Sequence, residues 1–171
     1  MVKLAVAVIT ASIDVKAKDV DPEEGSNSKR IIVSITHRRL ILFEGERVQK
    51  VYPVAVGKPS TPTPSGDFRI VNLIPNPTWY GPGKVVPPGP SNPVGTRWIG
   101  LSVKGYGIHG TSEPRSIGKA ASHGCVRMRQ ADLEELFDMV AAGDSVTLAA
   151  GRTPEVSRFV FTQVFQISFL N

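Results

Sequence analysis

The sequence lacks several features that define whole classes of protein. Its 171 residues include one cysteine, which excludes an intramolecular disulfide framework and a zinc site built from several cysteines. No stretch approaches the ~18 consecutive apolar residues that a membrane-spanning helix requires. The 20 lysines and arginines exceed the 15 acidic residues, but they form no run and no aromatic-rich basic patch. Nucleic-acid binding is therefore disfavoured, and the net charge of +5 favours anionic surroundings such as acidic wall polymers or lipid surfaces.

The composition that remains is that of a folded domain. Hydrophobic residues make up 41% of the chain, and the 16 glycines bring the apolar share to about half, the usual globular value. A chain of 171 residues predicts one domain. The 14 prolines, together with the glycines, predict many turns and long loops.

The two ends of the chain differ from its middle. The apolar run 4–11 resembles either a stunted signal peptide or, preferably, an edge strand, and a polar linker follows over 19–29. In the last twenty residues, phenylalanines recur at helical spacing but also alternate with polar residues as in a strand. We expect an N-terminal extension over 1–30, one folded domain over 31–151 and a hydrophobic tail over 152–171.

The middle of the chain has the pattern of a mainly β protein. Short apolar or β-branched runs predict strands over 31–36, 40–43, 48–56, 68–74, 97–103 and 146–149. Successive short strands indicate a two-sheet sandwich or a barrel-like fold with one or two short helices. The clear helix carries an apolar stripe over 133–141, with acidic residues in its first turns and Gly143 just beyond its end.

One long segment stands apart from these elements. Pro75–Gly95 contains seven prolines and four glycines, together with Trp79 and Tyr80. A loop longer than about 15 residues inside a compact domain is usually functional or an insertion. Exposed aromatics on a proline-stiffened segment suit a lid over an extended substrate, whereas an insertion without a role remains the alternative.

The residues that carry chemistry lie in two motifs, YGIHG at 106–110 and ASHGCVRM at 121–128. The thiol of Cys125 lies within sequence reach of two of the three histidines. Cysteine catalysis requires a thiolate, which a nearby imidazolium stabilises by lowering the thiol pKa, and the ring can then protonate a leaving amine. Gly124 permits a sharp turn that exposes the thiol and leaves the amides of Gly124 and Cys125 free to stabilise an oxyanion.

The residues by themselves leave two other interpretations open. Free cysteine is often buried and inert, so Cys125 could belong to a non-catalytic module. His109, His123 and Cys125 could instead hold zinc with an open position, as in a metal-dependent hydrolase. Since no further acidic or histidine ligand is evident nearby, thiol chemistry ranks above metal binding, and no cofactor is expected.

Both motifs resemble the signature of a known family. IHG at 108–110 and SHGCVRM at 122–128 are similar to the active-site motifs of the YkuD-type L,D-transpeptidase catalytic domain. Upstream, YPVAVGK at 52–58 and TPSGDF at 63–68 resemble that family's strand and its following turn. The likeness covers about residues 31–150 and implies a β-rich catalytic fold in which two sheets hold the histidine and cysteine segments side by side.

The resemblance also implies roles for individual residues. Cys125 corresponds to the nucleophile, His109 to the general base, and the Gly110 carbonyl to the group that orients the imidazole. Three further positions match residues that shape the nucleophile turn and the oxyanion hole: Ser122, His123 and Gly124. For His123 we expect a structural hydrogen bond. Arg127 matches a residue that meets a substrate carboxylate, with a structural ion pair as the alternative.

The activity that the resemblance implies is acyl transfer on bacterial peptidoglycan. A Cys125 thioester would release the terminal D-alanine of a tetrapeptide stem and form a 3→3 cross-link. Stem peptides would be acyl donor and acceptor, and carbapenem-type β-lactams would be covalent inhibitors. An L,D-carboxypeptidase would use the same residues with water as acceptor, and a cell-wall-binding module is the non-catalytic alternative. The expected location is the bacterial cell envelope, in the periplasm or cell wall, although the sequence shows no clear export signal.

Overall fold

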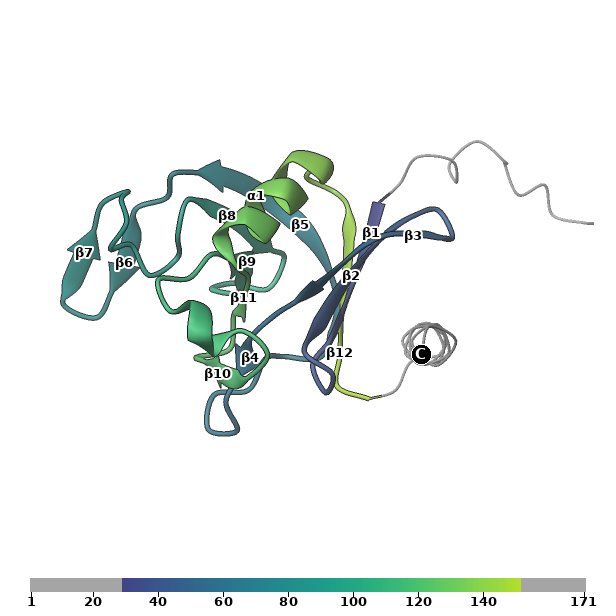
Figure 1. The fold of residues 1–171 in the computed structure, drawn as a ribbon, viewed down its shortest axis with the longest axis horizontal. Coiled ribbons are helices and arrows are strands. Elements are labelled where there is room, and N and C mark those ends of the chain that lie inside the picture. Colours follow the sequence, from purple (N-terminus) through teal and green to yellow (C-terminus); the bar gives the residue numbers. More distant parts are fainter. Residues whose placement is uncertain (1–28, 152–171) are drawn as a thin grey trace, which may run out of the picture.

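The computed structural model describes residues 29–151, so the expected N-terminal edge strand and the 152–171 tail lie outside the described residues. An eight-stranded sheet with the order β11-β9-β8-β5-β12-β1-β2-β3 forms the body (Figure 1). Its strands are β1 (Lys29–Ser34), β2 (Arg39–Glu44), β3 (Arg47–Pro53), β5 (Gly66–Pro75), β8 (Arg97–Leu101), β9 (Gly107–His109), β11 (Val126–Arg127) and β12 (Ser145–Ala149). Two small sheets pair β4 (Val56–Gly57) with β10 (Ala120–Ser122) and β6 (Trp79–Gly81) with β7 (Lys84–Val86).

The strand β5 joins the two halves of the large sheet. Its first residues pair antiparallel with β12, and its later residues pair antiparallel with β8. The register with β8 shifts between Ile70 and Asn72, and such an irregularity bends a strand and increases its twist. The expected mainly β, barrel-like class is thus confirmed as one curled sheet in which β5 carries the chain from one half to the other.

Burial follows the two-residue period of the strands. Ile31 and Val33 of β1 pack into the main core, whereas Ile32 packs with Ile41 and Phe43 on the opposite face. The residues of β1 on both faces of the sheet are therefore buried, which explains the continuous apolar run of this strand.

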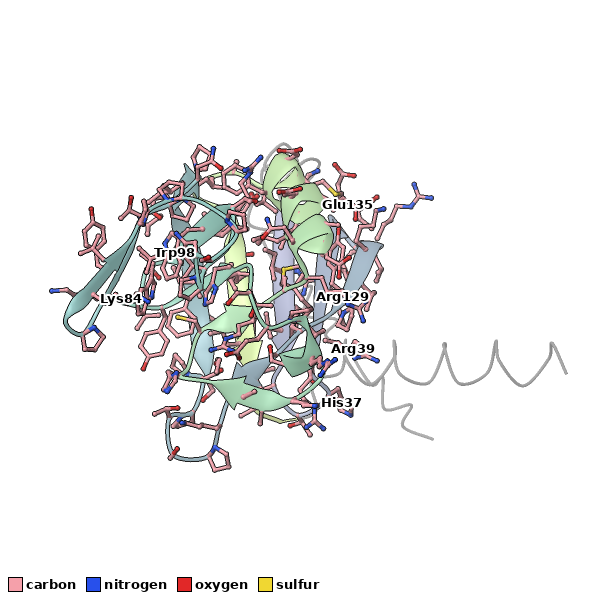
Figure 2. The ribbon with its side chains drawn as sticks, turned by 60° about the vertical axis from the view of Figure 1, so that its left-hand side comes forward. His37, Arg39, Lys84, Trp98, Arg129 and Glu135 are labelled. Carbon is pink, nitrogen blue, oxygen red and sulfur yellow. The ribbon has the colours of Figure 1, made fainter. Side chains whose placement is uncertain are left out.

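In the described part of the chain, the one α-helix is α1 (Gln130–Met139), which packs against the sheet beside β8. Leu133 and Leu136 are fully buried, as the apolar stripe predicts. On the side of α1 toward β3, Glu135 accepts a hydrogen bond from the Tyr52 hydroxyl at 2.9 Å and forms an ion pair with Lys50 (Figure 2). A short 3₁₀-helix, η1 (Pro114–Ser116), precedes β10. No helix within 29–151 is long and apolar enough to cross a membrane.

The Pro75–Gly95 segment contains the β6–β7 hairpin, which extends from the body (Figure 1). Tyr80 and Val85 are 76% and 60% exposed at its tip. At its base, the buried Asn92 donates to the Pro77 carbonyl at 2.7 Å and accepts from the Val94 amide at 3.0 Å. The segment is therefore an anchored hairpin, and its role as a lid stays a prediction.

All six predicted strands are present, but the 48–56 prediction is split. β3 ends at Pro53, and the chain leaves the sheet edge to form a bridge between Ala55 and Arg127 before β4 begins. The strands β4, β9, β10 and β11 have two or three residues each. Such strands are too short to show an alternating pattern, so the sequence did not reveal the strands that carry the two motifs.

Candidate active site

The two motifs meet where β9 and β11 pair in parallel. Arg127 lies opposite His109, and Val126 lies opposite Ile108. Because side chains alternate along a strand, His109 and Arg127 share one face of the sheet. The thiol of Cys125, just before β11, lies near enough to the Gly107 amide at the start of β9 for this amide to lower the thiol pKa. The structure thus brings the predicted cysteine and histidine segments together.

The thiol itself is half-buried. Its sulfur lies 3.6 Å from the Gly105 carbonyl oxygen, to which the S–H donates. It therefore rests between the Gly105 carbonyl and the Gly107 amide, on the chain that leads into the histidine strand.

Ser122 shapes the turn that precedes the nucleophile. Its hydroxyl donates to the Cys125 carbonyl at 2.5 Å and accepts from the Gly124 amide at 3.0 Å. Gly124 has a φ of +115°, and a Cβ there would lie 2.7 Å from the Tyr106 ring. Only glycine fits this turn without strain. The expectation that the Gly124 amide is free was wrong, because the Ser122 hydroxyl occupies it.

A loop after β4 supports this turn from behind. The Lys58 amide and the Thr61 hydroxyl both donate to the Ser122 carbonyl, at 3.1 and 3.2 Å. The loop is closed by the Thr63 hydroxyl, which accepts from the Gly57 amide at 2.8 Å. A Cβ at Gly57 would lie 2.3 Å from the Thr61 carbonyl oxygen, so the close approach requires glycine. The upstream motif therefore supports the cysteine turn through the backbone of Ser122.

The imidazole of His109 has a defined orientation. Its Nδ1 lies 2.6 Å from the Gly110 carbonyl oxygen. A carbonyl can only accept, so Nδ1 carries the proton and Nε2 bears the lone pair. This is the orientation that the resemblance to the family implies.

Trp98, which the sequence analysis did not single out, covers the imidazole. It is the cross-strand neighbour of His109, and the two rings stack with centroids 5.6 Å apart at 17°. A Cβ at Gly107 would lie 2.6 Å from the indole, and one at Gly100 would lie 2.9 Å from its nitrogen, so two glycines make room for the ring. Figure 2 places Trp98 on the side of the body from which the hairpin with Lys84 extends.

The electrostatics of the pair favour neutral groups. Burial, with a smaller contribution from the Arg127 charge, lowers the pKa of His109 to about 4. Burial raises the pKa of the Cys125 thiol, although the Gly107 amide and Arg127 oppose it. The expected imidazolium–thiolate pair is therefore corrected: in the resting site the imidazole is unprotonated, and the thiol keeps its proton at neutral pH.

Arg127 lies mostly buried beside this pair. Its Nη1 lies 3.0 Å from Glu113 Oε2, and the Glu113 side chain is 72% exposed. Within residues 29–151, the buried Nε of Arg127 has no hydrogen-bond partner. The guanidinium therefore has an ion-pair partner at the surface and an unused donor.

His123 lies apart from these groups. It is exposed, and its Nε2 lies 3.5 Å from Lys58 Nζ, which is a long and weak contact. In the described part of the chain, no three His, Cys, Asp or Glu side chains are placed to hold a metal ion. The zinc set of His109, His123 and Cys125 is therefore not assembled.

Comparisons with known proteins agree with this geometry. Residues 28–148 match the family model described as the L,D-transpeptidase catalytic domain, YkuD. A Bacillus licheniformis protein that bears the name L,D-transpeptidase YkuD is 46% identical over 119 residues, which are 70% of this chain and 64% of that protein. The match thus spans just under two thirds of the length of this relative.

Solved structures show the same fold. A cysteine-to-serine mutant of an Enterococcus faecium L,D-transpeptidase has a TM-score of 0.62 at 26% identity, over 72% of this chain and 50% of that one. The transpeptidase LdtMt1, solved in complex with imipenem, has a TM-score of 0.61 at 21% identity, over 72% of this chain and 59% of that one. At that identity the second likeness concerns the fold alone. Taken with the family match over 28–148, these findings show that the chain belongs to the L,D-transpeptidase catalytic domain family.

Proposed function

We propose that this chain performs acyl transfer on peptidoglycan stem peptides with Cys125 as nucleophile and His109 as general base. The observation that carries the proposal is the parallel pairing of β9 with β11. This pairing brings Cys125, which directly precedes β11, beside the strand that bears the imidazole, with the thiol next to the Gly107 backbone. The Gly110 carbonyl holds the Nδ1 proton, which leaves Nε2 to accept the thiol proton.

The first half-reaction follows from neutral partners. As the sulfur attacks the carbonyl that precedes the terminal D-alanine of a tetrapeptide stem, the thiol proton passes to His109 Nε2. The Cys125 amide donates a hydrogen bond to the tetrahedral oxyanion, since the Gly124 amide already donates to the Ser122 hydroxyl. The imidazolium then gives its proton to the leaving nitrogen. The C–N bond breaks, D-alanine departs, and a thioester remains on Cys125.

The second half-reaction restores the thiol. The side-chain amine of the third residue in a neighbouring stem attacks the thioester carbonyl and loses a proton to His109. The C–S bond then breaks, the sulfur regains the proton, and a 3→3 cross-link forms. If water attacks instead, the same residues give an L,D-carboxypeptidase.

Arg127 completes the proposed site. It shares the face of His109, and a guanidinium offers several donors in a planar fork that suits a carboxylate. We assign it to a carboxylate of the donor stem. This role requires that its pairing with Glu113 be exchanged for the substrate.

Two further elements of the proposal follow from the family. The chain belongs to the family over residues 28–148, and LdtMt1 was solved in complex with imipenem, so we propose that carbapenem-type β-lactams bind this chain and acylate Cys125. A peptidoglycan substrate places the protein in the bacterial cell envelope, in the periplasm or cell wall.

Mass spectrometry of the chain incubated with a tetrapeptide-stem muropeptide tests the proposal. Loss of D-alanine with dimer formation is the expected result, together with a thioester adduct on the protein that is absent in Cys125→Ala. Loss of D-alanine without dimers would establish the carboxypeptidase instead. An unchanged muropeptide, with no adduct, would contradict both activities and favour a wall-binding module. Replacement of the exposed Ser65, just before β5, by alanine is the matched control.

A further inference from the structure

The Gly110 carbonyl orients the proposed base, so its own support matters. The Gly110 amide donates to the Val94 carbonyl at 3.0 Å, and the Met128 amide donates to the His109 carbonyl at 2.9 Å. The peptide that follows His109 is therefore held on one side by β11 and on the other by the segment that leads into β8. The carbonyl that accepts the Nδ1 proton belongs to the next peptide and is joined to this one through the Gly110 Cα, so movement of that segment would displace Gly110 and its carbonyl oxygen.

The 94–96 segment and the chain that follows His109 touch through a pair of glycines. A Cβ at Gly110 would lie 3.1 Å from the Gly95 Cα, and one at Gly95 would lie 3.0 Å from the Gly110 Cα. The space beside both glycines is filled by the side chain of Gln130. Its Oε1 would lie 2.6 Å from a Cβ at Gly110 and 2.4 Å from one at Gly95. The amide of Gln130 thus packs directly against the backbone behind the histidine.

Gln130 is itself held by polar contacts. As the first residue of α1, it accepts from the Thr96 amide at 3.3 Å and donates to Glu134 Oε1 at 3.0 Å. It also donates to the Thr96 hydroxyl, which in turn donates to Glu134 Oε1 at 2.6 Å. These hydrogen bonds lower the pKa of Glu134, so its carboxylate is charged and accepts both donors. The three side chains form a closed set that fixes the Gln130 amide.

We propose that Gln130 is a positioning residue that, with Thr96 and Glu134, fixes the Gly110 carbonyl and thereby the tautomer and orientation of His109. This inference rests on the proposed role of His109 as base. The mechanism needs an Nε2 lone pair aimed at the thiol, and that requires an acceptor held still at Nδ1. Removal of the Gln130 amide leaves a void behind Gly110 and frees the 94–96 segment.

The direct test is the Nδ1 proton of His109, observed by NMR in the full chain labelled with ¹⁵N. In the unmodified chain this proton is protected and hydrogen-bonded. In Gln130→Ala we expect its exchange to accelerate and the Nε2-protonated tautomer to appear. Gln130→Met keeps the volume of the side chain but loses its hydrogen bonds. It therefore separates the effect of a void behind Gly110 from the effect of the lost hydrogen bonds, and it covers the case in which the alanine variant fails to fold. Gln49→Ala, exposed on β3, is the matched control.

Steady-state kinetics provide an independent test of the role of Gln130. With a tetrapeptide-stem donor, kcat of Gln130→Ala should fall roughly ten- to a hundredfold with KM little changed, because the reacting groups are misplaced while the substrate contacts remain. A protected Nδ1 proton with unchanged kcat in both Gln130 variants would overturn the proposal. If the unmodified chain shows no turnover, the proposed function fails, but the NMR measurement still decides whether Gln130 positions the imidazole.

Discussion

The indole of Trp98 stacks on the imidazole of His109, with ring centroids 5.6 Å apart and planes at 17°. Burial is the largest cause of the lowered His109 pKa, and the indole covers one face of the ring. Trp98 therefore helps to keep the imidazole in the unprotonated form that a general base requires.

Replacement of Trp98 by leucine should raise the His109 pKa from about 4 toward its ordinary value of 6.5, because water reaches the exposed ring face. An NMR titration of the imidazole carbons measures this change. Trp79→Leu, on the β6–β7 hairpin, is the control and should leave the titration where it is. A pKa that stays near 4 in Trp98→Leu would show that the indole does not shield the base.

The neutral resting pair predicts a distinct pH dependence. Burial raises the pKa of the Cys125 thiol. The rate of alkylation by iodoacetamide should therefore rise at a higher pH in the folded chain than in the same chain unfolded in urea. The acid limb of kcat/KM should lie near pH 4, because His109 stays unprotonated below the ordinary imidazole pKa. An alkylation rate that rises at a lower pH in the folded chain than in urea would indicate an imidazolium–thiolate pair instead.

Glu113 and a substrate carboxylate compete for Arg127 on the proposed mechanism. Glu113→Gln removes the charge of the ion pair at 3.0 Å and should lower KM for a carboxylate-bearing stem several-fold, with kcat unchanged. Steady-state kinetics with the free-acid donor and the same donor amidated at that carboxylate measure this, and the amidated donor should show no gain. Glu46→Gln, in the exposed β2–β3 turn, is the matched control. A higher KM in Glu113→Gln would instead indicate a structural ion pair.

Gly124 and Gly118 form a natural comparison. Both have positive φ, +115° and +85°, but a Cβ at Gly118 meets open space, whereas one at Gly124 lies 2.7 Å from Tyr106. Gly118→Ala should lower the free energy of unfolding by about 1–2 kcal/mol through backbone strain alone. Gly124→Ala should lower it further and also reduce Cys125 alkylation, because the Tyr106 ring must move at the nucleophile turn. Urea denaturation measures both, and equal losses would refute the role of that contact.

Much of the site was predictable because its chemistry lies in contiguous motifs. His109, Gly110, Ser122 and Cys125 were identified by residue type and by their resemblance to the family. The structure brings their segments together, and their catalytic roles stay predictions. The helix was predictable from its apolar stripe, with Leu133 and Leu136 buried. Trp98 and Gln130 were missed because neither belongs to a motif. Each acts through contacts with residues far along the chain, and a two- or three-residue strand carries no periodic pattern from which its partner can be inferred.

The sequence by itself determined the mainly β class, the strands of the core and the residue types on which the proposed chemistry depends, because these follow from local pattern and composition. Only the tertiary structure decided the protonation of His109 and Cys125 and the support of the proposed base. Burial sets the pKa of His109, and burial is a property of the packed molecule. The β9–β11 register places Arg127 opposite His109, and the glycine contact at 95 and 110 brings Gln130 behind it. These relationships join segments distant in the chain, so no stretch of sequence records them.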